Sequence, residues 1–225
     1  MKTIFYSKNI RKLALPIAAL IVLALGLSSC GKDGSVDNQN SFLLVTNAAE
    51  TSGPQDFYAD STKLTSSLAY GSSSAFLPTP SGSHLGRFKN SGTTNVNTSF
   101  NMVLQGEQSY NVFYIDGGSY AIFPNDRSAP QSGKARVRFI NLSTALTTNI
   151  DLVASGGAVL ASNLAFKSAS AFTDIDPSTS FTVNATGTST SILSIPASFQ
   201  AGHSYTVYIS GATALTIAPH IITER

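Results

Sequence analysis

The chain has 225 residues, of which only 12% are charged, and its 14 basic and 12 acidic residues give a formal net charge of +2. Four of the basic residues lie within residues 1–29, so the rest of the chain has ten basic and twelve acidic groups and no cluster of Lys or Arg. Without a basic stripe to follow a phosphate backbone, nucleic acid is excluded as an expected partner. A single cysteine also excludes an internal disulfide framework.

Residues 1–29 have the pattern of a secretory signal peptide. Basic residues, with no acidic one among them, precede an apolar run over residues 13–25 that is interrupted only by Pro16. The run is shorter than the roughly 20 residues that a membrane span needs, and it is followed by small residues typical of a cleavage region.

The only cysteine of the chain, Cys30, follows this run directly. The segment Leu-Ser-Ser-Cys-Gly at residues 27–31 resembles the bacterial lipobox, which predicts signal cleavage between Ser29 and Cys30 and lipidation of Cys30. The alternative is an ordinary secretory signal with an incidental cysteine, but a lone thiol has no disulfide partner in an exported chain. Lipidation with more than one acyl chain anchors a protein stably to a membrane without spanning it.

Residues 31–40 are Gly, Ser, Asn, Gln and charged residues, apart from Val36, and they have no apolar periodicity. This composition is typical of a flexible tether. We therefore expect the lipid on Cys30 to hold the chain at the outer membrane, facing either the cell surface or the periplasm.

From residue 41 onward the chain contains one sequence twice. LAYGSSSAF at residues 68–76 returns 96 positions later as LAFKSASAF, with six of nine residues identical. Segments further along the chain match as well. Ser-Tyr-Asn-Val at 109–112 matches Ser-Tyr-Thr-Val at 204–207, and Ile-Phe-Pro at 122–124 matches Ile-Ala-Pro at 217–219. Because solenoid repeats have periods of roughly 20 to 50 residues, these longer copies are expected to be small domains with separate cores.

Both copies consist of short alternating runs rich in Val, Ile, Phe, Tyr and Thr, separated by Gly, Pro, Asn and Ser. In residues 135–141, Val137 and Phe139 lie on one side and Arg136 and Arg138 on the other, which predicts a sheet with one solvated face. About seven or eight such strands in each copy are typical of an immunoglobulin-like sandwich.

We therefore predict an all-β protein with two tandem immunoglobulin-like β-sandwich domains after a lipoprotein signal peptide. The expected parts are a signal peptide (1–29), a lipidated tether (30–40), a first sandwich repeat (41–127), a linker (128–134) and a second sandwich repeat (135–225). The polar stretch around the linker is short, which predicts that the two domains touch.

The segment Ala-Arg-Val-Arg-Phe-Ile-Asn-Leu-Ser at residues 135–143 resembles the opening of the domain of unknown function 4397 family. The similarity continues at residues 163–166 and 201–207 and reaches the first copy through the repeat. It departs from the family at residues 177–179, where Pro-Ser-Thr lacks the glycine of the usual Pro-Ala-Gly turn. The resemblance implies a sandwich-type extracytoplasmic lipoprotein without an assigned chemistry.

No motif of a known enzyme class is present, whether a Gly-x-Ser-x-Gly elbow, His-Glu-x-x-His, Cys-x-x-Cys or a Walker loop. His84, His203 and His220 have no counterparts in the other copy, so we expect surface or turn histidines rather than ligands or bases. We therefore expect no catalytic residues, no metal, no cofactor and no enzymatic activity.

Three aspartates in turn-like stretches are candidate calcium ligands. Asp116, Asp174 and Asp176 lie in stretches with too few acids for the six to eight oxygens that calcium takes, which favours a role in turns. Asp56 and Asp151 open equivalent strands in the two copies, and we expect a shared structural hydrogen bond rather than a shared active site.

The best candidates for contact with a ligand or partner are two aromatic residues. Phe113 and Tyr208 are repeat equivalents, beside Asn111 and Thr206 on the strand face opposite a row of tyrosine and valine. They are interpreted as exposed platforms for a sugar or a partner protein. The alternative is that this face packs on the other domain or on a neighbouring strand.

The expected function is that of a lipid-anchored cell-envelope protein, acting as a binding or adhesion module for glycans or envelope proteins. One alternative is a structural spacer or assembly subunit of the envelope. Another is a polymer hydrolase, which requires a deep cleft with paired carboxylates or a histidine.

Overall fold

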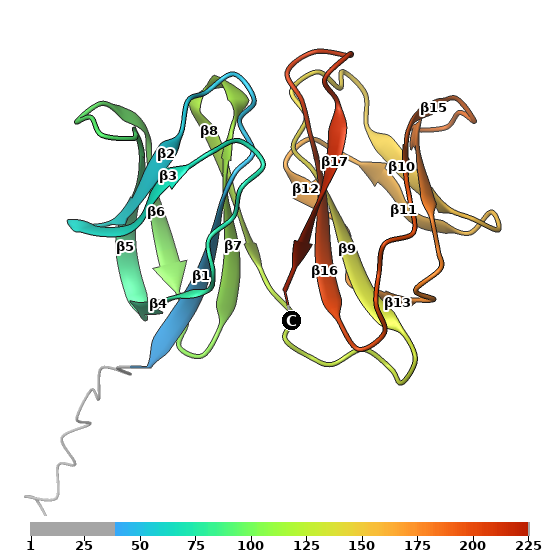
Figure 1. Cartoon of the computed structure of the whole chain (residues 1–225), viewed down its shortest axis with the longest axis horizontal. Helices are drawn as coiled ribbons and strands as arrows, with labels where there is room; N and C mark the ends of the chain where they lie inside the picture. The colour runs from blue at the N-terminus through green and yellow to red at the C-terminus, as the bar shows by residue number, and fades with distance from the viewer. Residues whose placement is uncertain (1–38, 225) are drawn as a thin grey trace, which may run out of the picture. The chain divides into compact units, whose positions relative to one another are not determined.

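The computed structural model describes residues 39–224, and these residues form strands joined by turns and one short 3-10 helix, Asp116–Gly118. The predicted all-β fold class is confirmed, with four sheets arranged as two sandwiches (Figure 1). The signal peptide, Cys30 and all but the last two residues of the predicted tether lie outside the described residues.

The first sandwich contains two four-stranded sheets. Sheet A has the order β4-β1-β7-β8 with β1 and β7 parallel, and sheet B has the antiparallel order β3-β2-β5-β6. The strands are β1 (Asn40–Asn47), β2 (Gln55–Ala59), β3 (Thr62–Leu68), β4 (Leu77–Pro80), β5 (Gly82–Asn90), β6 (Val96–Leu104), β7 (Ser109–Ile115) and β8 (Ser119–Pro124).

The second sandwich repeats this arrangement. Sheet C has the order β12-β9-β16-β17, with β9 and β16 parallel and β13 also paired to β9, and sheet D has the order β11-β10-β14-β15. The strands are β9 (Ala135–Asn141), β10 (Ile150–Ala154), β11 (Val159–Leu164), β12 (Ser168–Ala169), β13 (Thr173–Ile175), β14 (Phe181–Ala185), β15 (Ser191–Ile195), β16 (Ser204–Ser210) and β17 (Ala218–Thr223).

Strand pairing corrects one part of the sequence repeat. Val112 pairs with Ile122, and its equivalent Val207 pairs with Ile221, so Ile122 corresponds to Ile221 and not to Ile217. The sequence match in this region is therefore wrong by four residues. The cause is the longer connection between β16 and β17, which covers residues 211–217 where three residues join β7 to β8.

The nine repeated residues carry the chain from sheet B to sheet A in the first sandwich and from sheet D to sheet C in the second. In both, the amide of an asparagine on the central strand donates to the carbonyl of the leucine that opens the repeat, Asn47 to Leu68 at 3.0 Å and Asn141 to Leu164 at 3.3 Å. The repeated sequence therefore specifies a crossover between sheets.

The paired aspartates have the shared structural role that was expected. Asp56 accepts a hydrogen bond from the backbone N–H of Ser67 at 2.8 Å, and Asp151 accepts one from that of Asn163 at 2.7 Å. Both donors have left-handed backbones, with φ of 53° and 55°, a conformation that L residues adopt only when something local supports it. The carboxylates supply that support.

Each sandwich has an apolar core between its sheets, and a third core joins sheet A to sheet C within one compact unit. The expectation that the two sandwiches touch is confirmed. Strands β7 and β16 are buried at every residue, because one face meets its own sandwich and the other meets the neighbour. The fully or largely buried members of the third core are Leu44, Ala48, Phe113, Ile115, Ala121, Ile140, Leu142, Tyr208 and Ile222.

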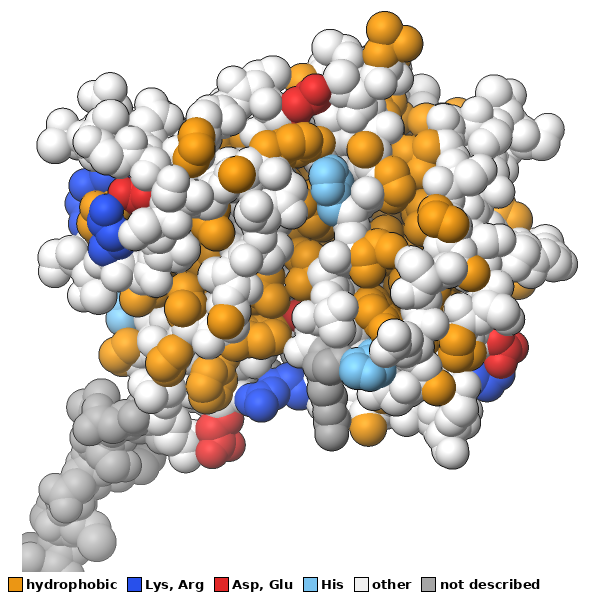
Figure 2. All heavy atoms as spheres, viewed as in Figure 1, with side chains coloured by type: hydrophobic (Ala, Val, Ile, Leu, Met, Phe, Trp, Pro, Cys, Tyr) orange, Lys and Arg blue, Asp and Glu red, His pale blue; other side chains and the backbone are white. Residues whose placement is uncertain are grey.

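This third core overturns one expectation about sheet C. The face that carries Arg138 was predicted to be solvated, but the Arg138 side chain is only 3% exposed. Its neighbour Arg136 lies near the rim, where it pairs with Asp126 and Asp174. Charged side chains are sparse on the face drawn in Figure 2, where uncharged polar groups and backbone surround the hydrophobic side chains.

Candidate functional site

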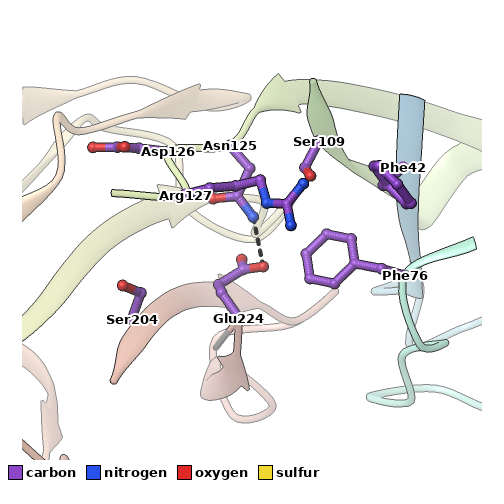
Figure 3. Close-up of a pocket in the computed structure, with 8 residues that line it drawn as sticks. All are labelled: Phe42, Phe76, Ser109, Asn125, Asp126, Arg127, Ser204 and Glu224. Atoms are coloured by element: carbon purple, nitrogen blue, oxygen red, sulfur yellow. Dashed lines mark hydrogen bonds between the residues drawn. The ribbon is translucent and has the colours of Figure 1, made fainter. Parts of the chain in front are cut away.

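A cavity of about 530 Å³, here called the linker cavity, opens between the two sandwiches (Figure 3). It lies where the connection after β8 meets the end of β17. Its lining comes from both sandwiches and from that connection: Phe42, Phe76, Ser109, Asn125, Asp126, Arg127, Ser204 and Glu224.

The topology explains why these residues meet. Ser109 and Ser204 are the first residues of β7 and β16, equivalent strands in the two sandwiches. The antiparallel neighbours β8 and β17 end beside those starts, which brings Asn125 and Glu224 to the same place. The cavity is thus formed by the same end of both repeats.

Glu224 is the centre of a buried polar network. Its carboxylate accepts hydrogen bonds from the side-chain amides of Asn111 at 2.6 Å and Asn125 at 2.7 Å, although its own side chain is only 3% exposed. Since both amides belong to the first sandwich or its connection, these bonds tie the end of the second sandwich to the first.

Arg138 lies behind this carboxylate. Its guanidinium donates to the hydroxyl of Thr206 and to the carbonyl of Pro124, and its Nη2 is 3.9 Å from Glu224 without a hydrogen-bond partner among the described residues. Burial lowers the pKa of Arg138 to about 10, and the nearby charge of Glu224 opposes that shift. The two residues form a buried ion pair with loose geometry. Arg138 also lines a second, smaller cavity of about 300 Å³ beside Phe172.

Two residues of the lining each carry a buried oxygen without a partner among the described residues, Oδ1 of Asn125 and Oγ of Ser204. The amide orientation of Asn125 is set by Glu224, because only the nitrogen can donate to a carboxylate. Its Oδ1 is therefore an acceptor that the described part of the chain does not satisfy. Buried acceptors of this kind normally receive a bond from water or a ligand.

Aromatic side chains form the opposite wall. Phe42 and Phe76 lie together on the side of the first sandwich, and Arg127 extends between them and Glu224 (Figure 3). The Arg127 guanidinium lies over the Phe42 ring at 5.3 Å from its centroid. The lining therefore combines ring faces, one cation, the acidic residues Asp126 and Glu224, and two residues that carry buried oxygens without a partner among the described residues.

The two aromatic residues proposed from the sequence lie elsewhere. Phe113 and Tyr208 are fully buried and contact each other in the third core, with ring centroids 5.3 Å apart. The interpretation as exposed platforms is wrong, and the alternative, packing on the other sandwich, is what the structure has. The face that carries them mixes aromatic residues with polar Asn111 and Thr206, a pattern that fits an exposed patch as well as an inter-sandwich contact.

The histidines occupy three different environments. His84 lies on strand β5, where its ring nitrogens form hydrogen bonds with Asp60 and with the carbonyl of Pro80. His220 is half-buried between the sandwiches, stacked on Tyr208 at 4.7 Å and bonded to the hydroxyl of Tyr70 at 3.2 Å, so the surface or turn role expected for it is wrong. His203 lies before β16 at 6.2 Å from the ring of Tyr205.

The aspartates weighed as calcium ligands each accept hydrogen bonds from protein groups. Asp116 accepts from the backbone of Glu50 and Thr51, Asp174 pairs with Arg136, and Asp176 pairs with Lys134. Within residues 39–224 no group of three or more His, Cys, Asp or Glu side chains is placed to hold a metal ion. In the same part of the chain no helix has the length and hydropathy of a membrane span.

Sequence reasoning missed Glu224, Asn125 and Ser204. Asn125 and Ser204 resemble ordinary turn and strand-start residues, and Glu224 is one acid near the end of the chain, so nothing in their sequence context marks them. The one available signal was Asn111, a polar residue among the aromatic and aliphatic residues of β7. The residues of the predicted lipid site, Ser29 and Cys30, lie outside the described residues.

Fold and site together define a tandem β-sandwich protein with a polar and aromatic cavity between its two sandwiches. The sequence model of DUF4397, described as "Domain of unknown function (DUF4397)", matches residues 41–151. The match supports the resemblance to this family and covers the first sandwich and the start of the second. The similar segments at residues 163–166 and 201–207 lie beyond it.

Solved structures of low sequence identity also match the chain. A family 26 carbohydrate-binding module from Eubacterium rectale Amy13K, in complex with maltoheptaose, covers 82% of this chain and 96% of its own at 11% identity and a TM-score of 0.27. A streptococcal virulence factor described as binding alpha-glucan covers 80% of this chain and 96% of its own, at 8% identity and a TM-score of 0.25. No curated protein matches the sequence.

Proposed function

We propose that this chain is a ligand-binding module of the bacterial cell envelope and that the linker cavity is its binding site. The observation that carries the proposal is a pair of buried oxygens without a partner among the described residues, Asn125 Oδ1 and Ser204 Oγ, on residues that line the cavity. Leaving such an atom unsatisfied costs about 1–3 kcal/mol, so a bound group that donates to it is favoured.

The lining favours a sugar unit as the ligand. Sugars present hydroxyl donors to acceptors such as Asn125 Oδ1 and Glu224, and their apolar C–H faces pack on rings such as Phe42 and Phe76. The charges of Asp126 and Glu224 are offset by Arg127 and by Arg138 nearby, which favours a neutral ligand over an ion. About 530 Å³ is within the range of roughly 300–1,000 Å³ typical of small-molecule sites.

The proposed location rests on the sequence. Lipidation of Cys30 would hold the module at the outer membrane, on the surface or in the periplasm. Fractionation of cells that express the natural chain and Cys30→Ala tests this. Release of the Cys30→Ala chain into the soluble fraction supports the anchor, and its retention in the membrane contradicts it.

Binding without catalysis is the role we propose for the cavity. A polymer hydrolase uses one carboxyl group as an acid and a second as a base or nucleophile. Here Glu224 accepts from two amides and Asp126 pairs with Arg136 and bonds to Ser128. Both carboxylates thus have protein partners already.

A spacer or assembly subunit is the second candidate, and the third core favours it. Apolar residues from sheets A and C are buried against each other. Such a contact holds the two sandwiches in one orientation, as a spacer requires. The two roles are compatible, and only the first requires a ligand.

The binding proposal is tested with the full chain carrying Cys30→Ala, applied to a printed array of bacterial and plant oligosaccharides. We expect at least one glycan to bind, and Ser204→Ala to weaken that binding about tenfold because one hydrogen bond is lost. Ser204→Ala should leave the melting temperature unchanged or higher, since Ser204 Oγ has no hydrogen-bond partner within residues 39–224. The control is Ser194→Ala, at an exposed residue of strand β15. The proposal is contradicted if no glycan binds, or if both variants lose the same binding affinity.

A further inference from the structure

The sheets of this protein have edge strands whose outer backbone groups lack neighbours, and natural proteins usually protect such edges. Among the described strands, β4, β8 and β17 contain proline, and β12 and β13 have only two and three residues. Strands β3 and β11 include left-handed residues and irregular pairing. Strand β15 is five residues long, and its pairing is irregular too.

Strand β6 is the exception. Its nine residues, VNTSFNMVL, include no charge and no proline. It pairs regularly with β5 from Leu104 to Thr98, with one irregularity near its start. No other backbone hydrogen bond is made by β6 in residues 39–224, and Val103 is 71% exposed.

We propose that β6 pairs in antiparallel orientation with β6 of a second copy of this chain, which joins two four-stranded B sheets into one of eight strands. Pairing centred on Phe100 sets Ser99 opposite Asn101 and Asn97 opposite Val103. In this register the core-facing Phe100, Met102 and Leu104 stay on the core side, which a shift by one residue would reverse.

A second copy fits this edge better than a foreign peptide does. Self-pairing of a charged strand would set like charges against each other, and β6 has none. The uncharged row of Asn97, Ser99 and Asn101 provides no charge pattern with which to select a different partner. Pairing with a second β6, in contrast, sets no like charges opposite each other and keeps the core-facing residues of both strands on the core side.

The pairing is separate from the proposed ligand site. Sheet B faces sheet A within the first sandwich, whereas the linker cavity lies beyond sheet A, between the sandwiches. Loss of sugar binding therefore says nothing about β6, and loss of pairing says nothing about the cavity.

The experiment measures mass by sedimentation equilibrium on the full chain with Cys30→Ala, at concentrations up to about 100 μM, which detects weak association. We expect a dimer, and we expect Ser99→Lys to return it to a monomer because two lysines would meet beside the symmetry axis. Strand pairing makes Ser194 on β15 the equivalent of Ser99, so Ser194→Lys is the matched control and should remain dimeric. A monomeric parent chain, or a dimer that survives Ser99→Lys, overturns the proposal.

A crosslink tests the register. Ser99→Cys and Asn101→Cys chains, each in the Cys30→Ala background, should form a disulfide-linked dimer when mixed and oxidised, because directly opposed Cβ atoms lie about 4.5–5.5 Å apart. Either chain alone should crosslink far less, since its cysteines are only diagonal neighbours. Equal crosslinking in all three samples, or none in the mixture, contradicts the pairing centred on Phe100.

Discussion

Phe113 and Tyr208 occupy the same position in the two repeats, and their rings pack edge to face, 5.3 Å apart, across the boundary between the sandwiches. A residue that meets its own equivalent is the mark of an interface with approximate two-fold symmetry, as in homodimers. The two repeats are therefore associated like two subunits joined by one chain. Because the repeats are related in this way, the same end of each repeat lines the linker cavity, together with the connection between them.

The ring of Tyr208, and not its hydroxyl, should carry the stability of this contact. Tyr208→Ala removes a fully buried aromatic ring from the third core, and we expect a loss of about 3–5 kcal/mol in the free energy of unfolding. Tyr208→Phe removes only a hydroxyl that has no partner among the described residues, so it should be neutral or stabilising. Urea denaturation measures both; a Tyr208→Phe loss above about 1 kcal/mol would show that the hydroxyl is bonded.

Glu224 should be important for stability despite its place near the end of the chain. In Glu224→Ala, Arg138 loses its nearest carboxylate and two buried amides lose their acceptor, which should cost about 3–5 kcal/mol. Glu224→Gln keeps an acceptor oxygen and should cost less. Thr223→Ala, one residue away and exposed, is the control in the same denaturation experiment, and equal effects at both positions would argue against the network.

Asp56 predicts a pH dependence of stability. Burial raises the pKa of Asp56, but hydrogen bonds from Lys63 and from the Ser67 N–H outweigh it and lower the pKa from 3.8 to about 2. The unfolded chain takes up the proton first as pH falls. The stabilisation, about 2 kcal/mol, is therefore complete above the unfolded pKa near 4 and is lost as pH falls from there towards 2.

Asp56→Asn should consequently lower the free energy of unfolding at pH 7 and converge on the parent chain near pH 2. The measurement is urea denaturation at a series of pH values. Asp176→Asn serves as the control, because the Asp176 side chain is 67% exposed and its pairing with Lys134 should contribute little. If the free energies of unfolding of the parent chain and of Asp56→Asn differ by the same amount at every pH, the lowered pKa assigned to Asp56 is contradicted.

Local patterns determined much of the architecture in advance. Period-two alternation and turn residues predicted strands, and the nine-residue repeat predicted two similar sandwiches, because both depend on neighbours close in sequence. The shared role of Asp56 and Asp151 was predictable for the same reason, since their partners lie about a dozen residues away in each copy.

Tertiary structure alone decided which surface each apolar face meets. The alternation around Phe113 and Arg138 is the same whether the second face meets water, a partner or the other sandwich, so burial between sheets A and C could not be read from it. The linker cavity depends still more on the fold. Asn125, Ser204 and Glu224 are brought together by strand pairing over long sequence distances, and a cavity exists only where such distant segments meet.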